Sequence, residues 1–296
     1  MKNRKSLITF LLVTFTISWV LFLVPLAFRN LDAQTHQIIT TVSFSLAMWG
    51  PGIGAIVSIL ASGGKFSDLN LGRLGAKRYL FWAWLLFPIL SVATGLVTLL
   101  LGFGQFDPNL TLINDSLAAL PPDAGLSPAL LVVAQVAAAF TVAPLINMLF
   151  AMGEELGWRG FLLPKLLHLG EWKAIIISSV IWGFWHALAI AQGLNYPEHP
   201  VLGIFMMVIF TTLLGIIFSW LYLNTQSPWT PALAHGSVNA VASLPVLFLI
   251  PDFDLALGGT LASVSGWVVL AVFVIWLIAT KRVPVNAKTS TPEDVE

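Results

Sequence analysis

The stretch "MKNRKSLITFLLVTFTISWVLFLVPLAF", residues 1–28, decides the fold class of this chain. Its apolar run is over twenty residues long, and about 20 residues suffice for a helix to cross the roughly 30 Å hydrocarbon layer of a bilayer. The run also exceeds the roughly 7–15 apolar residues of a secretory signal peptide, and no small-residue cleavage site follows it. We therefore predict a first transmembrane helix that is retained.

The whole chain has the composition of a polytopic membrane protein. Of its 296 residues, 57% are hydrophobic and 9% are charged, against about 25% charged residues in an average soluble domain. The formal net charge is zero, so the composition indicates no nucleic-acid partner. The chain has no cysteine, which excludes thiol nucleophiles, thiolate metal sites and disulfides.

Hydropathy predicts an all-α protein with eight transmembrane helices. They lie near 7–28, 37–61, 79–102, 128–152, 173–192, 201–223, 229–250 and 259–280. We divide the chain into three segments on this basis. These are the first three helices with an outer loop (1–127), a four-helix core (128–250), and the last helix with a polar cytoplasmic tail (251–296).

The distribution of charge predicts that both termini are cytoplasmic, because short loops rich in Lys and Arg stay on that side of the membrane. With eight spans, thirteen of the fourteen basic residues fall on the cytoplasmic side, Arg159 among them, and only Arg29 falls outside. The outer loops hold acidic residues instead: Asp32, Asp107, Asp115, Asp123, Glu198, Asp252 and Asp254. Removing one span would place the basic C-terminal flank outside, so the bias supports an even number of spans.

The stretch "GEELGWRG", residues 153–160, places three charges beside the fourth span. A charge inside a span costs roughly 2.5–3.5 kcal/mol and tends to be functional. Glu155 and Arg159 are four residues apart, so on a helix they share one face and can pair. Glu154 points about 100° away from them and has no obvious local partner. The competing interpretation is a helix end at the cytoplasmic interface, where these side chains reach water.

Two further polar clusters lie within apolar spans. In "WGFWH", residues 182–186, Trp182 lies one turn before His186 and shares its face of the fifth span. In "HGSVN", residues 235–239, His235 and Asn239 share one face of the seventh span. The alternatives to function are a hydrogen-bonded interior histidine in the first case and polar packing between helices in the second.

Chain geometry brings the clusters together. Glu154 lies sixteen residues before Gly170, at the turn between the fourth and fifth spans, and His186 lies sixteen residues after it. Because both arms of a helical hairpin rise equally per residue, these two residues are expected at similar depth. The seventh span starts from the same side, so His235 and Asn239 can reach that level. We therefore expect all four to converge on one buried polar pocket.

Two kinds of chemistry suit such a pocket. A carboxylate with imidazoles in a dry site can activate water as a general base, and an Asn or His donor can stabilise an oxyanion. The same residues can instead hold a metal, because Glu154, His186 and His235 form a donor set of the kind that binds hydrolytic zinc. The sequence allows zinc as a cofactor without requiring it.

The three motifs resemble those of the CAAX-protease and bacteriocin-processing family of intramembrane peptidases, also called the Abi family. "EELGWR" resembles its Glu-Glu-x-x-x-Arg motif, "WGFWH" its aromatic residue four before a His, and "HGSVN" its His four before an Asn. The order of the motifs and the spans that carry them also agree. The resemblance covers about 128–245, and one variation is Trp182, where the family often has Phe.

The resemblance implies an eight-helix, CAAX-protease-like intramembrane bundle with a cavity open toward the cytoplasm. At the matching positions, Glu154 and His186 would activate the attacking water, and His235 and Asn239 would stabilise the oxyanion. The resemblance also implies supporting positions that order the site: Glu155, Arg159 and Trp182.

The resemblance leaves the catalytic type and the substrate open. Family members have been described both as metalloproteases and as glutamate-type, metal-independent proteases. Eukaryotic relatives cleave prenylated CAAX proteins, and some bacterial relatives are tied to bacteriocin processing or self-immunity. We expect a peptide or protein substrate, lipidated or not, and a multi-pass location in the plasma membrane of a bacterium.

Two alternatives to a protease remain at this stage. A transporter also places polar residues at mid-membrane, and the "GPG" at 50–52 would fit a discontinuous helix. Paired repeats, which are usual in transporters, are not found, and the polar clusters occupy only one half of the chain. The other alternative is a catalytically idle family member that acts as a membrane scaffold.

Overall fold

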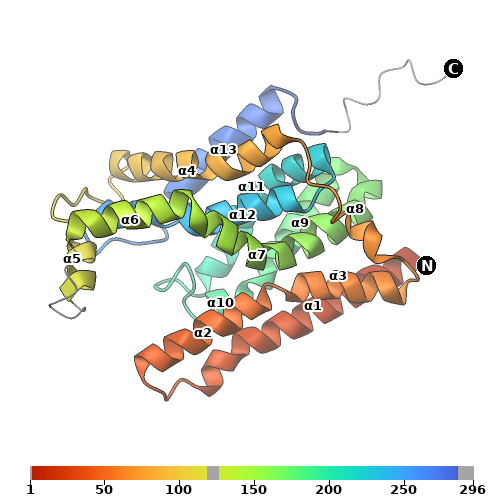
Figure 1. Ribbon diagram of the computed structural model, residues 1–296, viewed down its shortest axis with the longest axis horizontal. Coiled ribbons are helices and arrows are strands. Elements are labelled where there is room, and N and C mark those ends of the chain that lie inside the picture. The colour runs from red at the N-terminus through yellow and green to blue at the C-terminus, as the bar shows by residue number, and fades with distance from the viewer. Residues whose placement is uncertain (1, 119–126, 286–296) are drawn as a thin grey trace.

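The computed structural model describes residues 2–118 and 127–285, so the end of the outer loop and the polar tail lie outside the described residues. Within them, regular structure is helical apart from one isolated β-bridge between Phe106 and Leu249. The all-α prediction is therefore confirmed, and the helices form one elongated bundle (Figure 1).

The α-helices run along the chain in the following order. They are α1 (Lys2–Ala27), α2 (Ala33–Ala47), α3 (Gly50–Ala61), α4 (Lys77–Leu100), α5 (Thr111–Ala118), α6 (Pro128–Phe140), α7 (Val142–Gly157), α8 (Leu163–Leu166), α9 (Glu171–Trp185), α10 (Ala187–Ile190), α11 (Leu202–Thr225), α12 (Trp229–Val241) and α13 (Val264–Ala279).

The expected spans appear in the expected order, but with a different count. Among the described residues, six helices are long and apolar enough to cross a membrane, and the bent pair of α6 with 142–169 makes a seventh. The last expected span is shorter than predicted, because α13 has 16 residues and begins only after Ser263, whose side chain caps it by accepting from the Gly266 N–H. At about 1.5 Å per residue, α13 reaches roughly 24 Å.

The fourth span departs most from its expected limits of 128–152. It bends by 46° between α6 and α7 and then continues to Leu169. A π-helical turn at Trp158–Leu162 joins α7 to α8, and such turns often lie at functional sites. The charged motif therefore lies inside a continuous helical segment, not at a helix end.

Charged residues gather at the two ends of the bundle. The N-terminus of α1 and the end of the described chain lie at the same end (Figure 1), where the Val285 N–H donates to the Glu171 carboxylate at 2.6 Å. We call this the basic end; it carries Arg4, Lys5, Lys65, Arg73, Lys77, Arg78, Lys165, Lys173, Lys281 and Arg282. The opposite, acidic end carries Asp32, Asp107, Asp115, Glu198, Asp252 and Asp254. The assignment of Arg159 to the basic flank is wrong, because that residue is buried in the helix.

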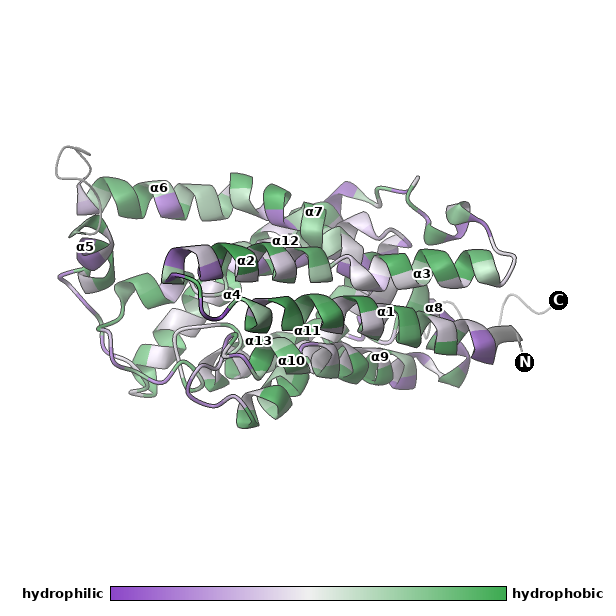
Figure 2. Ribbon diagram, turned by 90° about the horizontal axis from the view of Figure 1, so that it is seen from below, coloured by the Kyte–Doolittle hydropathy of each residue, from purple (hydrophilic) through white to green (hydrophobic). Residues whose placement is uncertain are grey.

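The outer surface between the two ends is apolar. Hydrophobic residues cover much of the length of α1 and α3 (Figure 2). Large aliphatic side chains point away from the bundle, such as Leu12 at 64% exposure and Val133 at 64%. This surface suits contact with lipid tails, as expected for a multi-pass membrane protein.

Glycines let α7 pack closely between α3 and α12 (Figure 1). A Cβ atom at Gly153 would lie 2.6 Å from the Met48 carbonyl oxygen and 2.7 Å from the Trp49 Cα. A Cβ atom at Gly236 would likewise meet the backbone of Pro144 and Met148 on α7. Small residues at helix contacts commonly allow such close approach in membranes, and here they bring α12 within reach of the charged motif.

Gly153→Ala is therefore expected to lower the stability of the bundle by about 1–3 kcal/mol, the usual cost of overpacking. The new methyl group meets backbone atoms, which cannot move aside as a flexible side chain can. Unfolding by SDS in mixed micelles measures the effect. Gly72→Ala is the matched control, because no atom lies within 4 Å of its added Cβ. Equal stability of the two variants would contradict the proposed contact.

Candidate functional site

The charged motif of α7 is buried in the bundle. Glu154, Glu155 and Arg159 are only 2%, 0% and 2% exposed. This rules out the interpretation in which they reach water at a helix end. Because a buried charge is costly without partners, the surrounding helices must supply them.

Glu155 lies at the centre of a buried ion network. Its Oε1 accepts from Arg159 Nη1 at 2.9 Å, as the spacing predicted, and also from the His235 Nδ1–H at 2.9 Å. The Arg159 guanidinium stacks on the ring of Trp182, with its Cζ 4.2 Å from the ring centroid. A carboxylate can only accept here, so the proton sits on Nδ1 of His235, and Nε2 is free for other contacts.

Glu154 is held by two indole groups. Its Oε2 accepts from the Trp182 Nε1–H at 2.6 Å and from the Trp158 Nε1–H at 3.4 Å. Trp158 was not among the predicted site residues, although its place four residues after Glu154 is a readable signal. The other oxygen, Oε1, makes no hydrogen bond with the residues that the structure describes.

His186 is the C-terminal cap residue of α9, and one of its ring nitrogens faces a backbone carbonyl group. Its Nδ1 lies 2.9 Å from the Trp182 carbonyl oxygen. Because a carbonyl can only accept, Nδ1 carries the proton and Nε2 carries the lone pair. The same tryptophan therefore orients Glu154 with its side chain and His186 with its backbone.

Asn239 lies one turn after His235 on α12 and is exposed. Within the described part of the chain its side chain has no hydrogen-bond partner. Its amide is thus free to bind a molecule that enters the bundle.

The four residues predicted to converge do so. Glu154, His186, His235 and Asn239 line one cavity of about 780 Å³, which we call the central cavity. This volume falls within the roughly 300–1,000 Å³ of typical ligand sites.

The central cavity is also lined by segments that carry none of the three sequence motifs. The C-terminal half of α1 and most of α2 contribute to it, as do the residues that follow α10. Examples are Phe22, Arg29, His36, Phe44 and Asn195. Of these, Arg29 alone was singled out from the sequence, as the one basic residue predicted to lie outside the cytoplasmic side.

The lining of the central cavity reaches the acidic end of the bundle. Its lining runs from the motif residues to Arg29 and His36, beside the α1–α2 turn at the acidic end. Cytoplasmic termini and a cavity open toward the cytoplasm therefore cannot both hold, because the N-terminus lies at the basic end (Figure 1). The expectation of cytoplasmic termini came from the charge bias, and the expectation of a cavity open toward the cytoplasm came from the resemblance. In the structure these two expectations exclude each other.

The residues as placed do not fit a zinc ion. Zinc ligands lie about 2.0–2.2 Å from the metal, so their donor atoms must lie close together. The donor atoms of Glu154, His186 and His235 do not all lie within 4.8 Å of one another. Among the described residues, such a group occurs at Glu198, His199 and Asp254 on the acidic end, where His199 pairs with Asp254 at 2.8 Å.

Comparison with known proteins agrees with the motifs. The family model described as type II CAAX prenyl endopeptidase Rce1-like matches residues 124–241. This segment of the chain is similar to the CAAX-protease family. The matched segment carries every residue of the CAAX-protease site predicted above, from Glu154 to Asn239. The family implies a protease that acts on peptides in a membrane. A search of curated proteins found no match.

The buried ion network generates a stability test. Arg159→Met leaves the Glu155 carboxylate buried without its cation, and removing one partner of a buried pair costs about 3–5 kcal/mol. The added change Glu155→Gln removes that uncompensated charge, so the double variant is expected to regain part of the loss. SDS unfolding of the two single variants and the double variant measures the coupling. Strictly additive effects would show that the pair does not interact.

Proposed function

We propose that this protein is a glutamate-type intramembrane endopeptidase. Glu154 and His186 activate the attacking water, and His235 and Asn239 stabilise the oxyanion. The observation that carries the proposal is the convergence of these four side chains, from three helices, on the central cavity. Its placement in the plasma membrane of a bacterium is part of the same proposal.

Water activation uses the two groups whose outward atoms remain free. With Oε2 of Glu154 held by two indoles, Oε1 is available to take a proton from water. The lone pair on Nε2 of His186 accepts the second O–H of the same water and orients it. The water oxygen then bonds to the scissile carbonyl carbon, and the carbonyl oxygen takes the negative charge.

The oxyanion is stabilised from α12. Asn239 offers its amide N–H₂ as a donor, and His235 offers Nε2–H when it is doubly protonated. This nitrogen is on the opposite side of the ring from the Nδ1 that binds Glu155.

Collapse of the intermediate completes the reaction. The carbonyl reforms, the C–N bond breaks, and the proton held by Glu154 passes to the leaving amine. Trp182 touches no reacting atom in this scheme. It is a positioning residue that fixes Glu154 through its indole and His186 through its carbonyl.

The substitution Glu154→Gln tests the base directly. Glutamine preserves the shape and the hydrogen bond from Trp182 but cannot take a proton, so kcat is expected to fall by about 10²–10⁴-fold. Peptide cleavage in proteoliposomes measures this, and product analysis of membranes from cells with either form identifies natural substrates. Wild-type cleavage by the Gln variant would falsify the assignment of the base. Because no metal takes part in the proposed steps, chelation is expected to leave wild-type activity unchanged.

Trp182→Phe tests the positioning role. The ring and its stacking on Arg159 remain, but Glu154 loses a donor at 2.6 Å. We expect kcat to fall about tenfold with KM unchanged, since the base is displaced and the rest of the cavity is intact. The matched control is Trp267→Phe on α13, whose indole N–H has no partner among the described residues. A parallel rise in KM, or an equal loss in the control, would contradict the role.

A further inference from the structure

The central cavity is closed toward the basic end. Beyond Glu154 the helix continues through Trp158, Leu162 and Leu163, which are at most 1% exposed. Phe10 of α1 packs edge-on against Trp158, with ring centroids 5.7 Å apart. These residues fill the space between the motif and the basic end.

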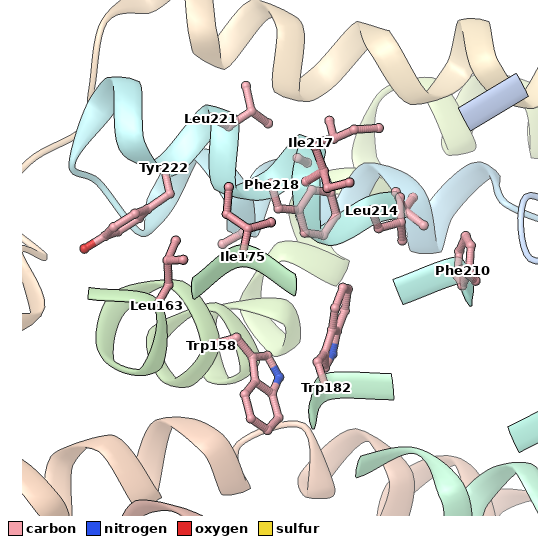
Figure 3. Packing of buried hydrophobic residues seen from close by; sticks show 14 of the residues in the cluster. Trp158, Leu163, Ile175, Trp182, Phe210, Leu214, Ile217, Phe218, Leu221 and Tyr222 are labelled. Carbon is pink, nitrogen blue, oxygen red and sulfur yellow. The ribbon is translucent and has the colours of Figure 1, made fainter. Parts of the chain in front are cut away.

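Residues from α9 and α11 close the same region from the other side. Ile175, Ile217 and Leu221 are fully buried; Figure 3 shows Ile175 near Leu163 and Trp158, with Ile217 beside Phe218. Close-packed side chains of this kind leave no passage for a peptide.

A second pocket at the basic end is separate. It has a volume of about 740 Å³ and is lined by residues such as Ser62, Asp68 and Lys165. It shares no lining residue with the central cavity. Peptide access from the basic end would therefore require the buried side chains between the two to separate.

The charge of the two ends indicates which side of the membrane each faces. Of the thirteen Lys and Arg residues that the structure describes, all but Arg29 and Arg159 lie near the basic end, and short basic loops remain cytoplasmic. The acidic end, where the central cavity opens, then faces the other side.

The cavity mouth carries a single permanent cation. Arg29 is the one Lys or Arg among the lining residues of the central cavity, and Glu154 is the one carboxylate; the acidic residues of the acidic end do not line it. Within the described residues, no carboxylate lies within 4.0 Å of its guanidinium. An exposed, unpaired cation at an entrance attracts anionic groups.

We propose that the central cavity takes peptide segments from the non-cytoplasmic side of the membrane, and that Arg29 at its mouth favours acidic segments. The substrates are then surface-exposed parts of membrane or secreted proteins, not cytoplasmic ones. That the bound segments are substrates rests on the proposed protease function, but the direction of access can be measured without any cleavage.

Cysteine labelling tests the direction, because the natural chain has no cysteine. Thr41→Cys lines the central cavity, and Ser62→Cys lines the pocket at the basic end. A membrane-impermeant maleimide is applied to spheroplasts and to inverted membrane vesicles. We expect Thr41→Cys to react in spheroplasts and Ser62→Cys only in inverted vesicles. Reaction of Thr41→Cys only in inverted vesicles overturns the proposal, whatever the outcome for catalysis.

Binding measurements test the role of Arg29. In the Glu154→Gln background, fluorescence anisotropy gives Kd for a labelled acidic dodecapeptide and for its counterpart with Gln and Asn in place of Glu and Asp. We expect Arg29→Gln to weaken only the acidic peptide, by about threefold as for an exposed ion pair, and Arg29→Lys to restore most of it. Equal effects on both peptides, or none, would remove Arg29 from recognition.

Discussion

Two adjacent carboxylates buried in one helical turn are the constraint on which the rest of the site depends. Glu154 and Glu155 are only 2% and 0% exposed, and a buried carboxylate is costly without partners. Each therefore draws in a different neighbour. Glu155 binds Arg159 along the helix and His235 from α12, while Glu154 binds the indole of Trp182 from α9. These contacts of the two carboxylates thus link three helices.

The same contacts prepare the functional groups. The Nδ1–H of His235 donates to Glu155, and the Nδ1–H of His186 donates to a backbone carbonyl oxygen. These hydrogen bonds fix the tautomers of both rings and leave both Nε2 atoms free. The two indoles bind one oxygen of Glu154 and leave the other. The site is organised before a substrate arrives, which reduces the reorganisation that catalysis would otherwise require.

Close packing makes this arrangement possible and also restricts access to the polar groups to one side. The glycines at 153 and 236 bring α3 and α12 against α7 at backbone distance, and a π-helical turn follows the motif. On one side of the motif the bundle is filled by tryptophan, leucine and isoleucine. On the other side α1 and α2 leave the central cavity open. Access to the polar groups is therefore one-sided, although they lie within a span.

The sequence by itself determined what depends on local periodicity. Apolar runs specified the helices and their order, the spacing of four residues specified the Glu155–Arg159 pair, and equal distances from Gly170 placed Glu154 level with His186. Helix geometry is repetitive, so such relations can be read along the chain.

Only the tertiary structure decided what depends on contacts between distant segments. It showed that the fourth span continues through the motif, that Trp158 and Trp182 hold Glu154, and that α1 and α2 form the cavity wall. It also placed the opening at the acidic end and the donor atoms too far apart for zinc. These features follow from how whole helix surfaces fit together, and no short-range pattern encodes that fit.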